Sequence, residues 1–285
     1  MLISVLSGKG GTGKTTIAVN LAVLLKNSRY VDCDVEEPNG HIFLNPEYSD
    51  ARRVEVMIPE IREDKCTGCG ECARFCYYNA LAVVKKKVIL FPEICHGCGG
   101  CLFACPHDAI AESKKDIGRI ETGYREKLEC VRGVLEIGEP VGVPIIREMK
   151  SGLEEDKLTI LDCPPGSSCT VVNSIQDSNF ALLVTEPTNF GLHDLKIAAR
   201  LTDKLGIPGG VVINRSGEDD AIIEEYCNSA GIPVLGKIPF ERAIAEIYSR
   251  GCLLVDDKRY RKYFEDIAQK LEGVLNHETA CDNKR

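Results

Sequence analysis

The sequence predicts an α/β protein with a mostly parallel sheet, interrupted by a small α+β insert. Two observations support this. Short apolar runs alternate with helical patterns toward both ends of the 285-residue chain, which is typical of parallel strands joined by crossover helices. Between about residues 45 and 155 the alternation stops, and eight of the 15 cysteines fall between Cys66 and Cys105. We therefore expect a discontinuous core at 1–59 and 113–285 and an insert at 60–112.

The core elements follow from hydrophobic periodicity. Leu2–Leu6 is an apolar strand that ends in a glycine-rich loop, and 15–26 is a helix with its leucines on one face. Further strands are expected at 30–33, 158–162, 181–185, 211–214 and 234–238. Further helices are expected at 192–205, 221–230, 241–250 and 260–275. In the middle we expect a hairpin of 81–84 with 88–90, strands at 117–122 and 131–138, and a helix at 145–155.

Composition excludes several classes of protein. The formal charge of −8 argues against nucleic-acid binding, which usually needs a basic face. No apolar run reaches the 18 residues of a membrane span, and the apolar N-terminal run is too short for a signal peptide. We therefore expect a cytoplasmic protein with no membrane partner. In that compartment clustered cysteines indicate metal binding and not disulfides.

The glycine-rich loop carries the first chemical motif. Residues 8–15 fit G-x-x-x-x-G-K-[ST] between a strand and a helix, the context in which this P-loop binds a nucleotide. Backbone N–H groups and the helix N-terminus favour phosphate, Lys14 is expected at the β- and γ-phosphates, and the Thr15 hydroxyl is expected on Mg²⁺. An empty glycine turn is the alternative, which the flanking strand and helix disfavour. The predicted nucleotide-binding residues here are Gly8, Gly10, Gly11, Thr12, Gly13, Lys14, Thr15 and Thr16.

A second lysine, Lys9, makes the loop similar to the deviant Walker A signature K-G-G-x-G-K-[ST] of the MinD superfamily. That group includes MinD, ParA, the nitrogenase iron protein and Mrp-type cluster carriers. The resemblance implies an ATPase in which Asp34 orients the attacking water. It also implies that Asp162, in a D-x-P-P-G stretch ending at Gly166, supports Mg²⁺ through water. As alternatives, either aspartate could be a helix cap.

The same resemblance assigns the base and the partner subunit. Asn214 is placed at adenine and Pro239 in a loop beside the base, although an asparagine after a strand is often only a turn residue. Two subunits of such proteins sandwich the nucleotides, and Lys9 is implied to reach into the partner's site and stabilise transition-state charge. We expect a homodimer or a heterodimer with a paralogue.

Two cysteine runs, 29 residues apart, carry the second motif. Both read C-x₂-C-x₂-C-x₃-C, the pattern of bacterial two-cluster ferredoxins, in which the fourth ligand of each run serves the other cluster. We therefore assign one [4Fe-4S] cluster to Cys66, Cys69, Cys72 and Cys105, and the other to Cys95, Cys98, Cys101 and Cys76. Zinc is the alternative, but two complete runs exceed what structural zinc needs. Tyr77 replaces the proline that often follows the first run.

The expected molecule is an α/β P-loop NTPase core with an inserted α+β bacterial-ferredoxin-like domain. Its resemblance is closest to MinD-superfamily ATPases that contain such an insert. We expect it to couple ATP, ADP and Mg²⁺ binding to electron transfer through two clusters to a redox partner. An iron–sulfur or metallocofactor assembly or carrier ATPase is the alternative, although the C-terminal half has no C-x₂-C pair. A MinD- or ParA-like positioning ATPase is less favoured because 260–285 lacks a basic amphipathic face.

Overall fold

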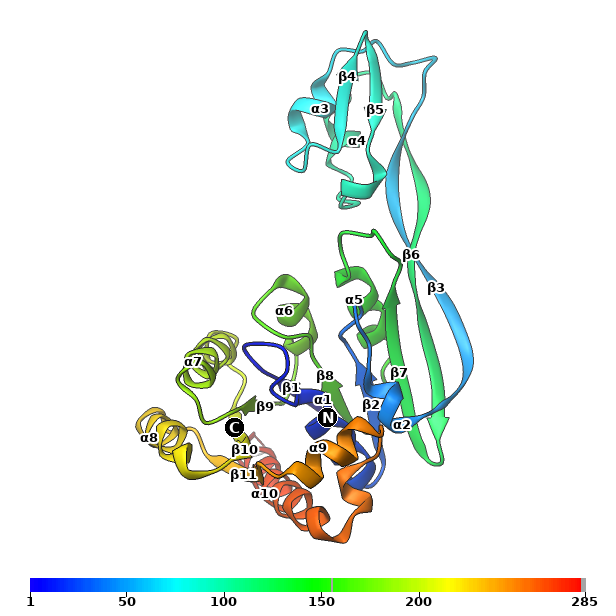
Figure 1. Cartoon of the computed structure of the whole chain (residues 1–285). Helices are drawn as coiled ribbons and strands as arrows, with labels where there is room; N and C mark the ends of the chain where they lie inside the picture. Colours follow the sequence, from blue (N-terminus) through cyan, green and yellow to red (C-terminus); the bar gives the residue numbers. More distant parts are fainter. Residues whose placement is uncertain (155, 283–285) are drawn as a thin grey trace.

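The computed structural model describes residues 1–154 and 156–282, and its main element is a nine-stranded sheet (Figure 1). The strand order is β11-β10-β9-β1-β8-β2-β7-β6-β3. All pairs from β11 to β7 are parallel, and β6 and β3 extend the sheet in antiparallel pairing. The prediction of a mostly parallel sheet is confirmed. The strands are β1 (Leu2–Leu6), β2 (Ser28–Asp32), β3 (Glu47–Ile61), β6 (Ile110–Arg125), β7 (Leu128–Leu135), β8 (Leu158–Asp162), β9 (Phe180–Thr185), β10 (Gly209–Ser216) and β11 (Val234–Pro239).

Helices cover both faces of this sheet, which buries every residue of β2 and β9. One face packs on α1 (Lys14–Leu24), α2 (Gly40–Leu44), α9 (Arg242–Ser249) and α10 (Lys258–Asp282). The other packs on α5 (Val143–Ser151), α6 (Cys169–Ile175), α7 (Asn189–Lys204) and α8 (Ala221–Ala230). The C-terminal ends of the parallel strands therefore meet at one edge, where loops can form a site.

The segment between the two halves of the core differs from the expectation. The strand expected at 117–122 is the lower part of β6, which pairs with β3 without a break from Tyr124 to Ile110 apart from two bulges. The strand β3 was not expected. The helix expected at 145–155 runs over Val143–Ser151, and its expected last residue, Glu155, lies outside the described residues.

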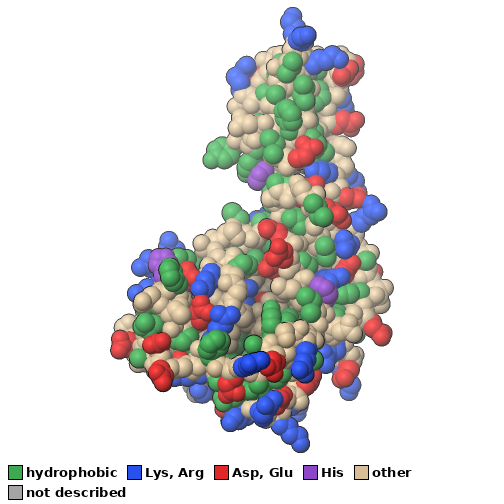
Figure 2. Space-filling model, in the orientation of Figure 1, with side chains coloured by type: hydrophobic (Ala, Val, Ile, Leu, Met, Phe, Trp, Pro, Cys, Tyr) green, Lys and Arg blue, Asp and Glu red, His purple; other side chains and the backbone are tan. Residues whose placement is uncertain are grey.

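Residues 62–109 form a separate lobe at the far end of the β3–β6 ribbon (Figure 1). It holds α3 (Glu71–Phe75), α4 (Gly100–Ala104) and a hairpin of β4 (Leu81–Val84) with β5 (Lys87–Leu90), which confirms the predicted hairpin. The lobe has a small core of its own around Cys72, Leu81 and Cys101. Figure 2 shows it as a distinct lobe above the body.

A search of the described helices for a candidate membrane span found none of sufficient length and hydrophobicity.

Candidate functional site

The glycine-rich loop joins β1 to α1 at the C-terminal edge of the parallel strands. Gly11 and Gly13 have φ angles of 80° and 90°, a left-handed conformation that glycine adopts without strain. Lys14 begins α1 and is buried. The backbone N–H of Gly166 donates to the Ser7 carbonyl at 3.0 Å, which joins the loop after β8 to the start of the phosphate loop.

Of the two predicted base-binding residues, Asn214 contacts this loop. Asn214, in β10, donates from Nδ2 to the Thr12 carbonyl at 2.8 Å, so its side chain holds the phosphate loop. A Cβ on Gly13 would lie 2.2 Å from the same nitrogen. Pro239 ends the neighbouring strand β11 beside Ser216. Thr16 is half-buried on α1 and its carbonyl accepts from Asn20. Contact of Asn214 and Pro239 with a base stays a prediction.

A buried acidic cluster lies behind the loop, at the ends of β2 and β8. The two strands pair so that Asp32 faces Asp162, and the Tyr30 hydroxyl lies 2.9 Å from Asp162 Oδ2 and 3.3 Å from Asp32 Oδ2. Burial raises the pKa of both carboxyl groups, and the charge of Asp162 raises the pKa of Asp32 further. Asp34 follows at the loop, where burial raises its pKa to about 6 although Lys14 acts to lower it.

Two oxygen atoms in this region suit a cation with its water shell. Asp162 Oδ1 and Thr12 Oγ1 are buried without a hydrogen-bond partner among the described residues, which is costly unless a ligand satisfies them. The Thr15 hydroxyl lies beside the Asp162 carboxylate and lowers its pKa, together with Lys14. A carboxylate, a hydroxyl and an adjacent phosphate site are the oxygen ligands that Mg²⁺ uses in nucleotide sites. The residues present therefore fit Mg²⁺.

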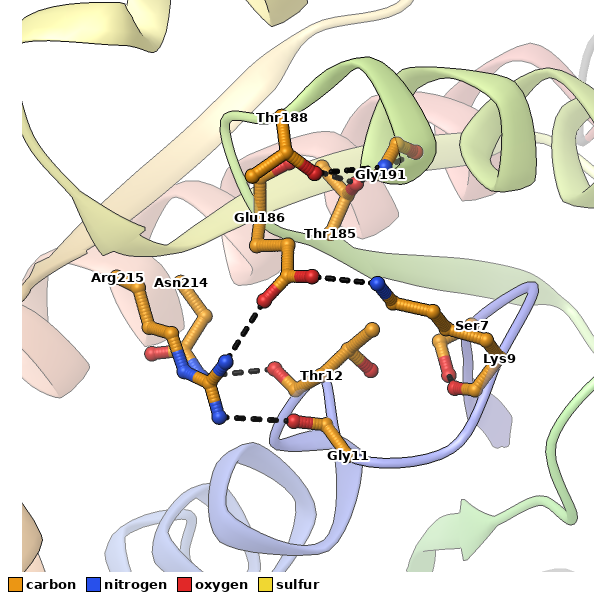
Figure 3. Close-up of polar contacts among 10 residues, drawn as sticks. All are labelled: Ser7, Lys9, Gly11, Thr12, Thr185, Glu186, Thr188, Gly191, Asn214 and Arg215. Atoms are coloured by element: carbon orange, nitrogen blue, oxygen red, sulfur yellow. Dashed lines mark hydrogen bonds and ion pairs between the residues drawn. The ribbon is translucent and has the colours of Figure 1, made fainter.

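Lys9 is held by a carboxylate of its own chain (Figure 3). Its Nζ lies 2.6 Å from Glu186 Oε1, at the end of β9, and Lys9 keeps 38% of its side chain exposed. Arg215 binds the other oxygen of Glu186 at 2.8 Å and also donates to the Gly11 carbonyl at 3.1 Å. One glutamate therefore ties the exposed lysine to the residue that braces the phosphate loop.

The cysteines of the lobe surround two separate cavities. Cys66, Cys69, Cys72 and Cys105 line the first, and Cys76, Cys95, Cys98 and Cys101 line the second. Each cavity thus combines three cysteines of one run with the last cysteine of the other run. The contact of α3 with α4 brings the two runs together.

Local backbone geometry suits thiolates in these cavities. The N–H groups of Ala80 and Ala109 donate to Cys76 Sγ and Cys105 Sγ at 3.3 Å. Positive φ angles at Gly68, Gly70, Gly97 and Gly99 let the chain turn around each cavity. No three His, Cys, Asp or Glu side chains of the described residues converge on one ion. Four cysteines line each cavity, and four thiolates are the donor set that an iron–sulfur cluster uses.

Two other cysteines lie beside the acidic cluster, but their thiols are poorly suited to react. Cys33 and Cys163 are fully buried directly after Asp32 and Asp162. Burial raises the pKa of both thiols, that of Cys163 to about 12. A buried thiol with a raised pKa is a poor nucleophile, so both act here as small core side chains.

Four residues of the site were not anticipated: Glu186, Arg215, Tyr30 and Asp32. Glu186 and Arg215 lie far from Lys9 in sequence, and no spacing rule joins them. Asp32 stands at the end of a strand next to Asp34, and this position could have marked it as part of the site. Tyr30 alternates with Asp32 on one side of the strand, but its facing carboxylate comes from β8, which depends on strand order.

Comparison with known proteins identifies the family of the nucleotide-binding domain. Residues 3–254 match the family model described as the CobQ/CobB/MinD/ParA nucleotide binding domain. An uncharacterized protein of Methanocaldococcus jannaschii is 33% identical over 283 residues, which cover 94% of this chain and 96% of that protein. An iron-sulfur cluster carrier protein of Pyrococcus abyssi is 27% identical, covering 99% of this chain and 89% of its own.

Solved structures share the fold. The septum site-determining protein MinD of Pyrococcus horikoshii, complexed with Mg-ADP, superposes with a TM-score of 0.61 at 20% identity, covering 96% of this chain and 98% of that one. At this identity the similarity establishes the MinD-like P-loop NTPase fold.

Proposed function

The chain belongs to the CobQ/CobB/MinD/ParA family of nucleotide-binding domains, and from this premise we propose an ATPase that couples its nucleotide state to electron transfer through two [4Fe-4S] clusters. The observation that carries the proposal is the pairing, in one chain, of a P-loop with two cavities of four cysteines each. The lobe that holds the cavities is joined to the nucleotide domain by two paired strands.

At the nucleotide, each residue has a distinct task. Lys14 and the N–H groups of the phosphate loop bind the phosphates, and Thr15 and Asp162 hold Mg²⁺ and its water. Asp34 orients the attacking water. Lys9 stabilises the charge that develops on the transferred phosphoryl group, as a preorganised cation does in a site shielded from water.

The position of Lys9 supports a role that changes with assembly. Lys9 keeps 38% of its side chain exposed although Glu186 keeps only 11%, so the ammonium group is held where solvent and a second chain can reach it. Face-to-face association of two chains over the nucleotide would let Lys9 exchange Glu186 for a phosphate of the partner's site. The second chain is either identical or a paralogue.

In the lobe, Cys66, Cys69, Cys72 and Cys105 would hold one cluster and Cys95, Cys98, Cys101 and Cys76 the other. When bound, such clusters supply carriers of single electrons with potentials set by hydrogen bonds, charge and exposure. Cys69 and Cys98 are exposed, so electrons can enter or leave at the lobe surface. The acceptor or donor is a redox protein.

Cluster assembly or delivery is the second candidate function. The similarity to the iron-sulfur cluster carrier protein of Pyrococcus abyssi favours it. Four cysteines lining each cavity favour retention of a cluster instead, because a transferred cluster needs ligands that are easily replaced. A positioning role on a membrane has less support, since α10 carries mixed charges. The last residues counted in that expectation, 283–285, lie outside the described residues.

One experiment separates the two candidates. Chains purified without oxygen are assayed for iron and sulfide, and their ATPase rate is measured with the clusters oxidised and reduced. An ATPase rate or a cluster potential that changes with the state of the other site supports electron transfer. Rapid loss of iron to an apo-protein acceptor supports a carrier, and a chain without iron–sulfur clusters contradicts both.

A further inference from the structure

One side chain bridges the body and the cysteine-rich lobe at the middle of the ribbon. Lys115, in β6, lies 2.8 Å from Glu139 Oε1 and donates to the Pro92 carbonyl at 2.8 Å. Only 20% of the Lys115 side chain and 13% of the Glu139 side chain are exposed. This burial distinguishes the bridge from the exposed ion pairs elsewhere on the ribbon, which contribute little.

On the lobe side, the bridge ends next to a cavity cysteine. Pro92 begins the 3₁₀ turn Pro92–Ile94, and Cys95 follows it. The Pro92 carbonyl that accepts from Lys115 also accepts from the Cys95 N–H at 3.4 Å. Lys115 is therefore linked through one carbonyl group to the backbone N–H of a cysteine that lines the second cavity.

On the body side, the bridge ends in a loop that touches both expected nucleotide-sensing segments. Glu139 belongs to residues 136–142, between β7 and α5. Leu135, just before this loop, donates its N–H to the carbonyl of Val35, the residue after Asp34, at 2.8 Å. At the other end, a Cβ on Gly142 would lie 2.4 Å from the Val35 side chain and 3.8 Å from Thr170.

Thr170 is connected to Asp162 by a short segment of the chain. It stands in α6, directly after the loop that starts at Asp162 and contains Gly166. The helices α5 and α6 are joined by Lys150, whose ammonium group donates to the Asn173 carbonyl at 3.0 Å, and by Arg147 with the Asn173 side chain at 2.8 Å. The loop that contains Asp34 and the loop that follows Asp162 are therefore both connected to residues 136–142 by direct packing contacts. A movement of either loop would displace residues 136–142.

We propose that Lys115 is the positioning residue through which the nucleotide site acts on the second cysteine cavity. The inference rests on the proposed function and adds to it the place of coupling. Movement of 136–142 with the nucleotide state shifts Glu139, and Lys115 transmits that shift to the Pro92 carbonyl and the Cys95 loop. Because charge and hydrogen bonding near a cluster set its potential, the effect falls on the second cluster more than on the first.

The test uses the full-length chain with its clusters. Midpoint potentials are measured by redox titration followed by electron paramagnetic resonance, once with ADP and once with a non-hydrolysable ATP analogue. The variant Lys115→Met removes the ammonium group and keeps an apolar stem. The matched control is Lys114→Met. Lys114 directly precedes Lys115 in β6, but 69% of its side chain is exposed and it pairs with Glu55.

The wild-type chain and Lys114→Met are expected to show a nucleotide-dependent shift in the potential of one cluster. Lys115→Met is expected to lose this shift while iron content and ATP binding stay unchanged, and its potential falls because a positive charge is gone. Glu139→Gln serves as a second variant if Lys115→Met holds no cluster. It leaves the Lys115–Pro92 bond in place and is expected to weaken the shift.

Different results would overturn the proposed function and the role of Lys115. If the cluster potentials of the wild-type chain are the same with ADP and with the ATP analogue, the proposed coupling is overturned, and the inference with it. A wild-type shift that persists unchanged in Lys115→Met, or in Glu139→Gln where the first variant is empty, overturns the inference and leaves the proposed function standing.

Discussion

The two lysines of the phosphate loop differ in burial, and this difference fixes what each can do. Lys14 is buried at the start of α1, where the proposed function places a phosphate bound within the same chain. Lys9 is held outside by Glu186 at 2.6 Å. The motif identified both lysines from sequence, but the carboxylate that holds Lys9 comes from Glu186, directly after β9 and 177 residues away.

Alanine at the two positions should therefore separate binding from turnover. Lys14→Ala is expected to abolish ATP binding because a buried cation at the phosphates is lost. Lys9→Ala is expected to keep ATP affinity and lose about 100-fold in kcat, the typical effect of removing one group that stabilises transition-state charge. Calorimetric titration and a phosphate-release assay measure the two effects. A Lys9→Ala chain with normal turnover would contradict the role of Lys9 across the dimer.

Asp34 should give the ATPase a dependence on pH. Its pKa is raised to about 6 by burial, and the proposed role needs the ionised carboxylate, because the protonated group is a weaker acceptor for the attacking water. We expect kcat to fall as the pH drops through about 6, while ATP binding changes less. Asp34→Asn is expected to be nearly inactive at every pH. A wild-type rate that stays level down to pH 5 would argue against this assignment.

The raised pKa of Asp34 affects the free energy of unfolding in the opposite direction: higher pH favours activity but lowers stability. The folded chain keeps a proton on Asp34 up to pH of about 6, whereas the unfolded chain releases it near the ordinary value of 3.8. Between these values the folded state binds more protons, so the free energy of unfolding falls as the pH rises. Urea denaturation at several pH values should show this slope, and Asp34→Asn should reduce it.

At the scale of elements, the helices and strands that could be predicted are those whose hydrophobic pattern is visible within a short stretch of sequence. The core strands have continuous apolar runs and the helices a clear period, so Leu158–Asp162 and Ala221–Ala230 fall at the predicted bounds. The strand β3 was missed because most of its residues are exposed on both faces, which leaves no alternation to detect. Its partner β6 lies about 60 residues later, and pairing over that distance cannot be deduced from a sequence window.

The two cavities make a prediction about pairs of cysteines. If each cavity holds one cluster, Cys76→Ala with Cys95→Ala damages a single cavity and leaves about four irons per chain. Cys66→Ala with Cys76→Ala removes two cysteines of the same run but damages both cavities, and is expected to leave almost no iron. Iron and sulfide assays distinguish the two double variants. Equal iron in both would contradict the exchange of the fourth cysteine between runs.

At the scale of the molecule, the motifs predicted the residues of both proposed sites but not how the two sites are joined. Cysteine spacing and the glycine-rich loop are local signals that needed no knowledge of the fold. The proposed link between them depends on the register of β3 with β6 and on the loop 136–142. The contacts of this loop with Lys115 and Val35 belong to no sequence motif, so they could not be predicted. The lobe has its own core, and the two main cores lie in the body and at the base of the ribbon.

Separate cores predict that the body folds without the lobe. The ribbon ends with Ile61 paired to Ile110, a geometry that a two-residue Asn-Gly turn can close. Replacing 62–109 by that turn should give an iron-free chain that still binds ATP with an affinity close to that of the full chain.

The same deletion tests whether the body depends on the lobe for more than stability. Thermal unfolding should show one transition close to the main transition of the full chain, because no residue of the two body cores is removed. The matched control is the full chain stripped of iron, which keeps the lobe sequence and lacks only the clusters. If the shortened chain fails to bind ATP while the stripped chain succeeds, the lobe is part of the nucleotide domain's fold. If both bind ATP, and both lose the redox dependence of the ATPase rate expected of the full chain, the clusters act on a nucleotide domain that is complete without them.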